Sequence, residues 1–207
     1  MNKFFNNIWF KCISTLLIIA LFSGGLLSIL SDVLYVSAEE RTSRAVKKLY
    51  NGIEQQYQVI LDADSIDSNT NSPIIFDNGQ ITKIFIVGKK TSGDYDLLLQ
   101  STGNEGFKNG TITVWVKVNV NTLLNTTKIV TVLLDSYDKQ TLMSQLGGSY
   151  YDSFLIDISD KYDKLFTSNK NDTSENYKNI VTGATKSANA GCNAVNNVIK
   201  YMESWEK

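Results

Sequence analysis

Histidine is absent from the 207 residues of the chain, which also has only two cysteines and one proline. The absence of histidine excludes serine–histidine–aspartate triads, imidazole general bases and histidine-ligated zinc. The two cysteines, Cys12 and Cys192, lie near opposite ends of the chain. A disulfide framework or a cysteine-based metal site is therefore not expected. Any redox chemistry must come from a cofactor, because the side chains do not supply it.

An excess of basic residues is missing as well, since 20 Lys and Arg are balanced by 21 Asp and Glu. Nucleic-acid-binding proteins carry a basic patch, so nucleic acid is not an expected partner. No glycine-rich loop follows a predicted strand, which leaves Rossmann and P-loop nucleotide sites without support. Asp62, Asp64 and Asp67 are spaced somewhat as in a calcium loop, but the glycine and the distal glutamate of that motif are missing. We interpret this segment as a solvated loop.

One long apolar run is present, CISTLLIIALFSGGLLSILS, which covers residues 12–31 without a charge. At about 1.5 Å per residue, a helix of this length crosses the ~30 Å hydrocarbon core of a membrane. Lys3 and Lys11 precede the run and charges of both signs follow it, so the positive-inside rule places residues 1–11 in the cytoplasm. We therefore expect a single transmembrane anchor over residues 12–36. The alternative is a cleaved signal peptide, with residues 36–38 (VSA) as its cleavage site.

The remainder is expected outside the membrane, as a helical stalk over residues 37–57 and a domain over residues 58–207. Val46, Leu49, Ile53 and Tyr57 share one face at helical spacing, which predicts a helix over residues 38–57 that continues the membrane helix.

Strand patterns dominate the first part of the domain. Residues 74–76 and 81–88 flank the sequence DNG at 77–79, a strong signal for a hairpin. The segment TITVWVKVNV, residues 111–120, alternates so that five apolar side chains share one face: Ile112, Val114, Val116, Val118 and Val120. Residues 128–136 (KIVTVLLDS) are expected to pair with it in an antiparallel sheet.

Helical and irregular patterns follow the strands. Residues 138–148 predict a short helix that ends at Gly147 and Gly148, residues 150–158 are compatible with helix or strand, and residues 164–179 form a polar loop. Residues 186–205 predict a helix with an apolar stripe: Ala188, Cys192, Val195, Val198, Ile199 and Met202. The expected fold class is α+β, with one N-terminal transmembrane helix and an extracytoplasmic domain made of an antiparallel sheet and flanking helices.

Small and hydroxyl-bearing residues are concentrated directly before and at the start of this last helix, in the sequence VTGATKSANAGC at 181–192. A helix N-terminus has unpaired N–H groups and a partial positive charge, which suit a phosphate. Gly183 and Ala184 leave room for a bulky group, and the hydroxyls could hold a phosphate or carry one as an ester. The simpler interpretation is that Thr182 or Thr185 caps the helix.

The sequence TGATKS at 182–187 resembles the S/T-G-A-T-x-S/T motif of the FMN-binding domain family. This domain occurs in the flavin-carrying subunits of Rnf complexes and of sodium-pumping NADH:quinone reductases. The N-terminal membrane helix, the paired strands near 111–135 and the helix after the motif are also similar to the family's layout. The resemblance implies FMN joined through its phosphate to the last threonine of the triplet, in a motif formed by Thr182, Gly183, Ala184, Thr185, Lys186 and Ser187. It further implies that a separate flavin transferase attaches the cofactor, using FAD and a divalent metal.

By the same resemblance, the chain is expected to be an electron-transfer subunit of an ion-translocating ferredoxin:NAD oxidoreductase in a bacterial cell membrane. Its expected partners are the other membrane subunits of such a complex, the transferase and membrane lipid, and no side chain is assigned a catalytic or metal-binding role. The family usually has an aspartate where this chain has Asn179, and its E-T-P-G stretch near the flavin is echoed only by Gln140 and Thr141. Two alternatives remain: a stand-alone flavinylated carrier, and a non-redox surface domain in which the TGAT turn is a cap.

Overall fold

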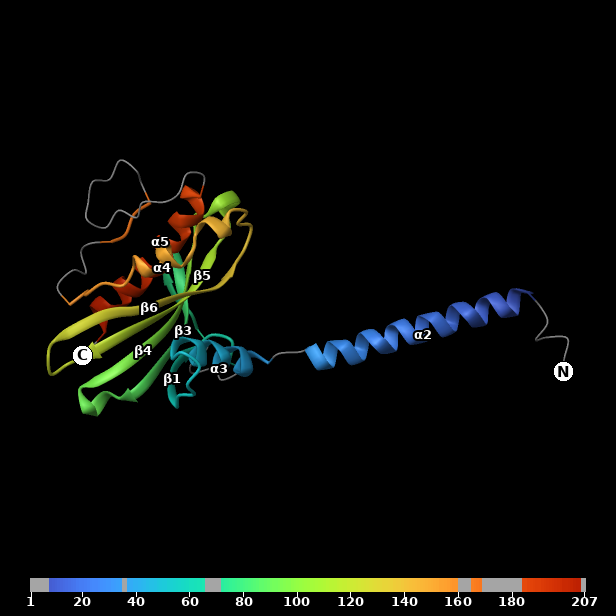
Figure 1. The fold of residues 1–207 in the computed structure, drawn as a ribbon, viewed down its shortest axis with the longest axis horizontal. Coiled ribbons are helices and arrows are strands. Elements are labelled where there is room, and N and C mark those ends of the chain that lie inside the picture. The colour runs from blue at the N-terminus through green and yellow to red at the C-terminus, as the bar shows by residue number, and fades with distance from the viewer. Residues whose placement is uncertain (1–7, 35–36, 66–71, 160–164, 169–183, 206–207) are drawn as a thin grey trace. The chain divides into compact units, whose positions relative to one another are not determined.

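The computed structural model describes residues 8–34, 37–65, 72–159, 165–168 and 184–205. The chain divides into two compact units, Met1–Arg41 and Thr42–Lys207. Helix α2 (Ile8–Leu34) makes up most of the first unit (Figure 1). Among the described residues, one segment, Lys11–Leu30, is long and apolar enough to cross a membrane.

Polar side chains in α2 bond within the helix. The Thr15 hydroxyl donates to the carbonyl of Lys11 at 2.8 Å, and the Ser23 hydroxyl donates to the carbonyl of Ile19 at 2.9 Å. A hydroxyl that bonds to the preceding turn needs no water, so these residues are compatible with an apolar surrounding.

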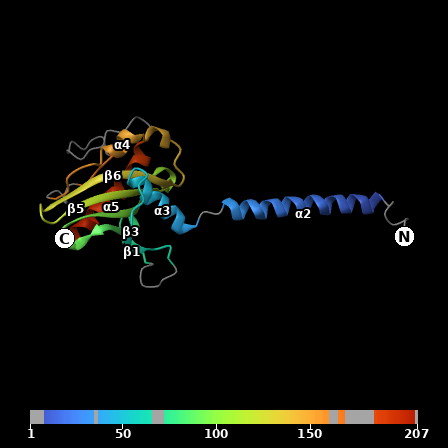
Figure 2. The same ribbon diagram turned by 60° about the horizontal axis from the view of Figure 1, so that its bottom comes forward.

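The second unit is built on a six-stranded sheet in which every pairing is antiparallel. The strand order is β1-β3-β4-β5-β6 (Figure 1; Figure 2). Strand β2 pairs with β3 beyond the end of β1. The strands are β1 (Tyr57–Asp62), β2 (Ile74–Phe76), β3 (Gly79–Lys89), β4 (Asp94–Gly103), β5 (Ile112–Asn121) and β6 (Thr126–Tyr137). The structure confirms the α+β class with an antiparallel sheet and flanking helices, as well as the hairpin at residues 77–78.

The alternation of apolar and polar residues in β5 determines which face of the sheet packs into the main core. All five of its predicted inward residues are 0% exposed. They contact helix α5 (Thr185–Ser204), whose predicted apolar stripe is buried as expected. Removing such side chains from water is the main stabilising contribution to the fold.

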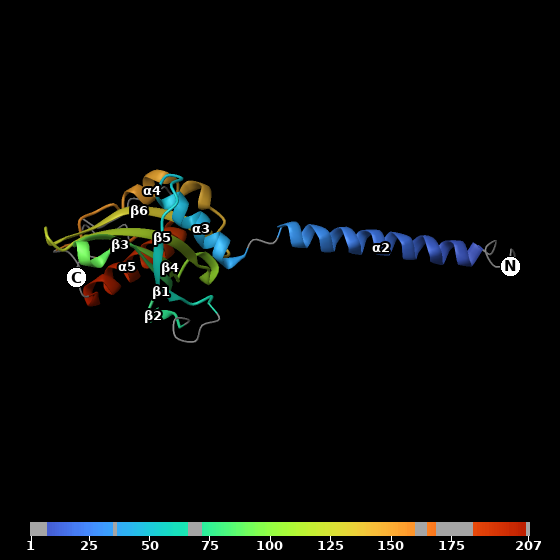
Figure 3. The same ribbon diagram turned by 90° about the horizontal axis from the view of Figure 1, so that it is seen from below.

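The opposite face of the sheet carries a second core, which helix α3 (Ala38–Leu49) covers (Figure 3). Val46 and Leu49 of this helix pack against Phe85 and Leu98 of the sheet, together with Trp115. The sheet is thus apolar on both faces. This explains why Trp115, on the more polar face of the predicted strand, is only 3% exposed.

The predicted helix over residues 38–57 is wrong at its C-terminal end. α3 ends at Leu49, where the Gly52 N–H bonds to the Lys47 carbonyl at 2.8 Å and the Asn51 N–H bonds to the Lys48 carbonyl at 3.3 Å. Asn51 has a φ of 53°, so these bonds form a Schellman cap with Asn51 in the left-handed position. The pair Asn51-Gly52 is therefore the sequence signal that ends this helix. Ile53 is exposed and Tyr57 begins β1, a strand that the sequence patterns did not predict.

Two further predictions, both for the segment after β6, are wrong. The predicted helix over residues 138–148 is reduced to a single 3-10 turn, η3 (Met143–Gln145). Gly147 and Gly148 open the next helix, α4 (Gly148–Asp152), instead of ending the previous one. The ambiguous segment 150–158 is part helix and part extended chain, since Asp157 forms an isolated bridge with Lys128 of β6.

An ion-pair cluster joins β1, β3 and α3. The buried Lys83 Nζ lies 3.0 Å from an Asp62 carboxylate oxygen and 2.9 Å from one of Asp64, and it donates to the Thr42 hydroxyl at 3.3 Å. Two carboxylates of the calcium-like segment are therefore paired with a lysine, and Asp67 lies outside the described residues. This cluster connects Thr42 of α3 to the edge of the sheet.

Candidate functional site

The described part of the TGATKS motif forms the first turn of α5. Ala184 occupies the N-cap position and Thr185 is the first helical residue. Ala184 and Ser187 are buried, Thr185 is half-buried and Lys186 is exposed. Four of the six predicted site residues therefore lie together at one helix N-terminus, and the structure does not describe Thr182 and Gly183.

Among the described residues, no side chain caps α5. Ala184 has no side-chain acceptor, and Thr185 lies one position too late in the chain to be the cap. The interpretation of Thr185 as a helix cap is therefore wrong, whereas the one for Thr182 falls on a residue that is not described. The first-turn N–H groups carry a partial positive charge, which makes this end of the helix favourable for an anion.

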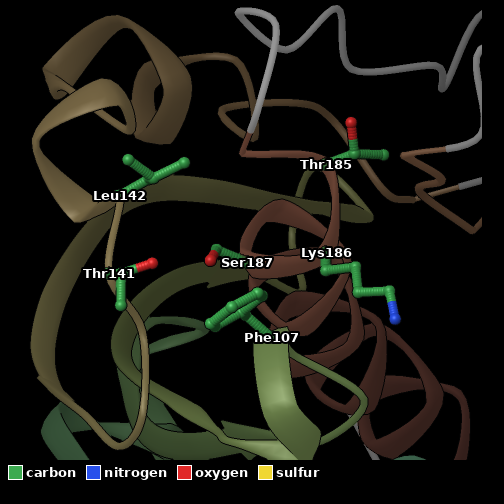
Figure 4. A pocket seen from close by; sticks show the side chains of 6 residues that line it. All are labelled: Phe107, Thr141, Leu142, Thr185, Lys186 and Ser187. Carbon is green, nitrogen blue, oxygen red and sulfur yellow. The ribbon is translucent and has the colours of Figure 1, made fainter.

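A cavity of about 230 Å³ opens beside this first turn. Three segments that are distant in the sequence line it: Phe107, Thr141, Leu142, Thr185, Lys186 and Ser187. In Figure 4, Thr141 and Leu142 lie on one side, Thr185 and Lys186 lie on the other, and Phe107 closes the lower end of the view. Sites that bury a whole drug-sized ligand measure about 300–1,000 Å³, so this cavity can enclose only part of such a molecule.

Gln140 connects the three segments. Its Oε1 accepts hydrogen bonds from the Ser187 hydroxyl at 2.6 Å and from the Phe107 N–H at 3.1 Å. Its Nε2 donates to the Asp138 carbonyl at 2.9 Å and to the Phe107 carbonyl at 3.4 Å. A buried amide with these partners is well satisfied, so it holds the cavity walls in a defined arrangement.

The second turn of α5 is fixed by Tyr150 of α4. The Tyr150 hydroxyl donates to the Ala188 carbonyl at 2.7 Å. Burial raises the pKa of Tyr150 well above its ordinary value, so the hydroxyl keeps its proton and remains a donor. Gly191 faces the same hydroxyl, and a Cβ at this position would lie 2.5 Å from it. The start of α5 is consequently held against α4.

Asparagines on α5 attach the loop that precedes Phe107. The Asn193 amide donates to the Asn104 carbonyl at 3.0 Å, and Asn189 and Asn193 both donate to the Glu105 carboxylate, at 3.4 and 3.5 Å. The loop that carries the aromatic wall of the cavity is therefore bonded to the helix that carries the motif.

No family model, curated protein or solved structure matches this chain. Its function must therefore be inferred from the site itself.

The sequence patterns found the motif but not the whole cavity. Phe107 and Leu142 lie in irregular segments without periodicity, and no signal in one sequence marks them. Gln140 and Thr141, the echo of the E-T-P-G stretch, lie beside the motif in the structure. Asn179 is not described.

Trp115 and Trp205 lie away from the cavity. Trp115 belongs to the second core, and the Trp205 Nε1 donates to the Tyr95 hydroxyl at 3.0 Å. Neither is among the residues that line the cavity, so both have packing roles in the described part of the chain.

The residues at the cavity fit a phosphate that carries a planar organic group. The helix start, which no side chain of the described residues caps, and the exposed Lys186 suit the phosphate. Phe107 and Leu142 offer an apolar wall for the organic part. Thr185 lines the same cavity, and in Figure 4 its hydroxyl points upward, away from Phe107.

Proposed function

We propose that this protein is a membrane-anchored electron carrier that holds FMN through a phosphoester bond to Thr185. The supporting observation is the position of Thr185, which is the first residue of a helix that no described side chain caps and which lines a cavity with an aromatic wall. A threonine whose only role was to cap the helix would occupy the N-cap position and would not have to line a cavity.

The proposed anchor is α2, which would place the domain outside the cytoplasmic membrane of a bacterium. Its apolar segment is long enough to span the bilayer, and its Thr15 and Ser23 hydroxyls bond to its own backbone. A covalent link has a physical advantage in that location, because a dissociating cofactor would be diluted into the surroundings.

The chain's own residues would hold and orient the cofactor. The Thr185 oxygen would become the ester oxygen, while the first-turn N–H groups and Lys186 would stabilise the negative charge of the phosphate. Phe107 and Leu142 would cover part of the ring system, and the small cavity would leave the remainder accessible to redox partners. The flavin supplies the electron-transfer chemistry, and the protein supplies binding, orientation and electrostatics.

Attachment would require a separate enzyme. A threonine hydroxyl is a weak nucleophile, and the described residues that line the cavity include no carboxylate or imidazole to activate it. We therefore propose that a flavin transferase modifies Thr185, and that the finished protein works with the other membrane subunits of an Rnf-type or Nqr-type complex.

Intact mass spectrometry of the protein co-expressed with its transferase tests this proposal. The wild type should gain the mass of one FMN less one water and should fluoresce as a band in a denaturing gel. Thr185→Val should lose both signals completely. Thr141→Val, an isosteric change of the other threonine in the same cavity, should keep both. A wild-type chain that remains unmodified would contradict the proposal and favour a non-redox surface domain.

A further inference from the structure

We propose that Phe107 is the residue that contacts the planar ring at this site, and that Gln140 is the positioning residue that holds Phe107 there. The inference rests on the proposed function and specifies how the cavity recognises the ring. Phe107 is the only aromatic side chain among the residues that line the cavity in the described part of the chain, and it is partly exposed. Aromatic faces favour stacked or edge contacts with other rings.

Gln140 forms hydrogen bonds with both the backbone N–H and the backbone carbonyl of Phe107. It accepts from the Phe107 N–H at 3.1 Å and donates to the Phe107 carbonyl at 3.4 Å. The same Gln140 oxygen accepts the Ser187 hydroxyl of the motif at 2.6 Å. One amide therefore sets the distance between the aromatic wall and the first turn of α5.

The backbone around Phe107 requires such a clamp. Glu105, Lys108 and Asn109 have φ values of 66°, 52° and 56°, in a region that residues other than glycine rarely occupy. Strained residues of this kind persist when surrounding contacts over-determine them, and they are concentrated at binding sites.

Two glycines allow the loop to close over Gln140. A Cβ on Gly106 would lie 2.6 Å from the Gln140 Nε2, and a Cβ on Gly110 would lie 2.5 Å from the same atom. Real Cβ atoms do not approach other atoms this closely, so both positions must lack a side chain for the amide to reach Phe107.

The test uses the full-length, flavinylated protein purified in detergent, with intact mass confirming equal flavin content. The readouts are quenching of flavin fluorescence by iodide and the visible circular dichroism of the flavin. Phe107→Leu keeps the backbone bonds but should raise iodide access several-fold and reduce the dichroism. Tyr137→Leu is the matched control, because it removes an exposed aromatic residue that does not line the cavity. It should leave both readouts unchanged.

Gln140 variants separate positioning from ring contact. Gln140→Met, which is similar in size but makes none of the four bonds, should reproduce the optical changes of Phe107→Leu. Gln140→Glu retains two acceptor oxygens for the Phe107 N–H and the Ser187 hydroxyl, and should restore part of the signal. The double variant with Phe107→Leu and Gln140→Met should match Phe107→Leu alone, because Gln140 acts through Phe107.

The outcomes are distinguishable. Unchanged quenching and dichroism in flavinylated Phe107→Leu would refute the ring contact. A change in Phe107→Leu with none in Gln140→Met, or additive effects in the double variant, would refute the positioning role. A wild-type chain without flavin would instead show that the proposed function itself has failed.

Discussion

Replacing Gly103 with alanine is the sharpest test of how α5 rests on the sheet. A Cβ on Gly103, at the end of β4, would lie 2.0 Å from the Ala190 carbonyl oxygen and 2.4 Å from the Ala194 nitrogen. Ordinary contacts of a Cβ begin at 3.4 Å, so the helix would have to withdraw by about 1.4 Å. Both neighbours are backbone atoms of a helix, which cannot move aside independently.

The withdrawal would also stretch three hydrogen bonds between α5 and β4 or the residue after it. Ser101 donates to the Ala194 carbonyl at 2.7 Å, Asn193 donates to Asn104 at 3.0 Å, and Asn197 donates to Thr102 at 3.1 Å. Overpacking costs about 1–3 kcal/mol. Each lost bond adds about 0.5–1.5 kcal/mol. We therefore expect Gly103→Ala to lower the free energy of unfolding by about 3–7 kcal/mol.

Thermal unfolding of the full chain in detergent, followed by tryptophan fluorescence, measures this effect. For a domain of this size, 1 kcal/mol corresponds to roughly 2–4 °C, so the midpoint should fall by about 6 °C or more. Gly148→Ala is the control, because nothing lies within 4 Å of its added Cβ. It should leave the midpoint within about 1 °C of the wild type. A midpoint for Gly103→Ala as close to the wild type as this control would refute the close packing of α5.

Two further predictions concern contacts away from the cavity. Lys83→Met leaves Asp62 and Asp64 without their cation, so the free energy of unfolding measured by chemical denaturation should fall by about 1–3 kcal/mol. The loss stays moderate because Asp64 is largely exposed and its charge remains hydrated. Burial alone lowers the pKa of Lys83, but the two carboxylates outweigh it and raise this pKa above its ordinary value of 10.5. The stabilisation is therefore present below pH 10.5, and the difference between Lys83→Met and the wild type should shrink as the pH rises past this value. Asn196→Ala removes two bonds to the backbone of Phe166, which it holds at 2.8 and 2.9 Å. Faster hydrogen exchange at the Phe166 N–H is expected, and unchanged exchange would contradict it.

Local patterns were sufficient for the central strands and the last helix. The alternation in residues 112–120 and the stripe from Ala188 to Met202 each define an apolar face without reference to the rest of the chain. The position of Thr185 at a helix start followed in the same way, from a change of composition and periodicity.

Other parts of α5 could not be predicted from its own pattern. Asn193, Asn196 and Asn197 do not belong to the predicted apolar stripe, yet all three are buried. Their amides bond to backbone groups of the segments at 102–104 and 166, which come next to the helix only after the chain has folded. A buried polar side chain depends on its partners, and these partners are 30 or more residues away in the chain.

The sequence by itself determined the apolar segment, the central antiparallel strands and the motif at the start of α5, because periodicity and composition act over short distances along the chain. Only the tertiary structure decided the second core under α3, the cavity and the connection from Ser187 through Gln140 to Phe107. These features join residues from separate segments, so their geometry depends on how the helices and loops pack on the sheet.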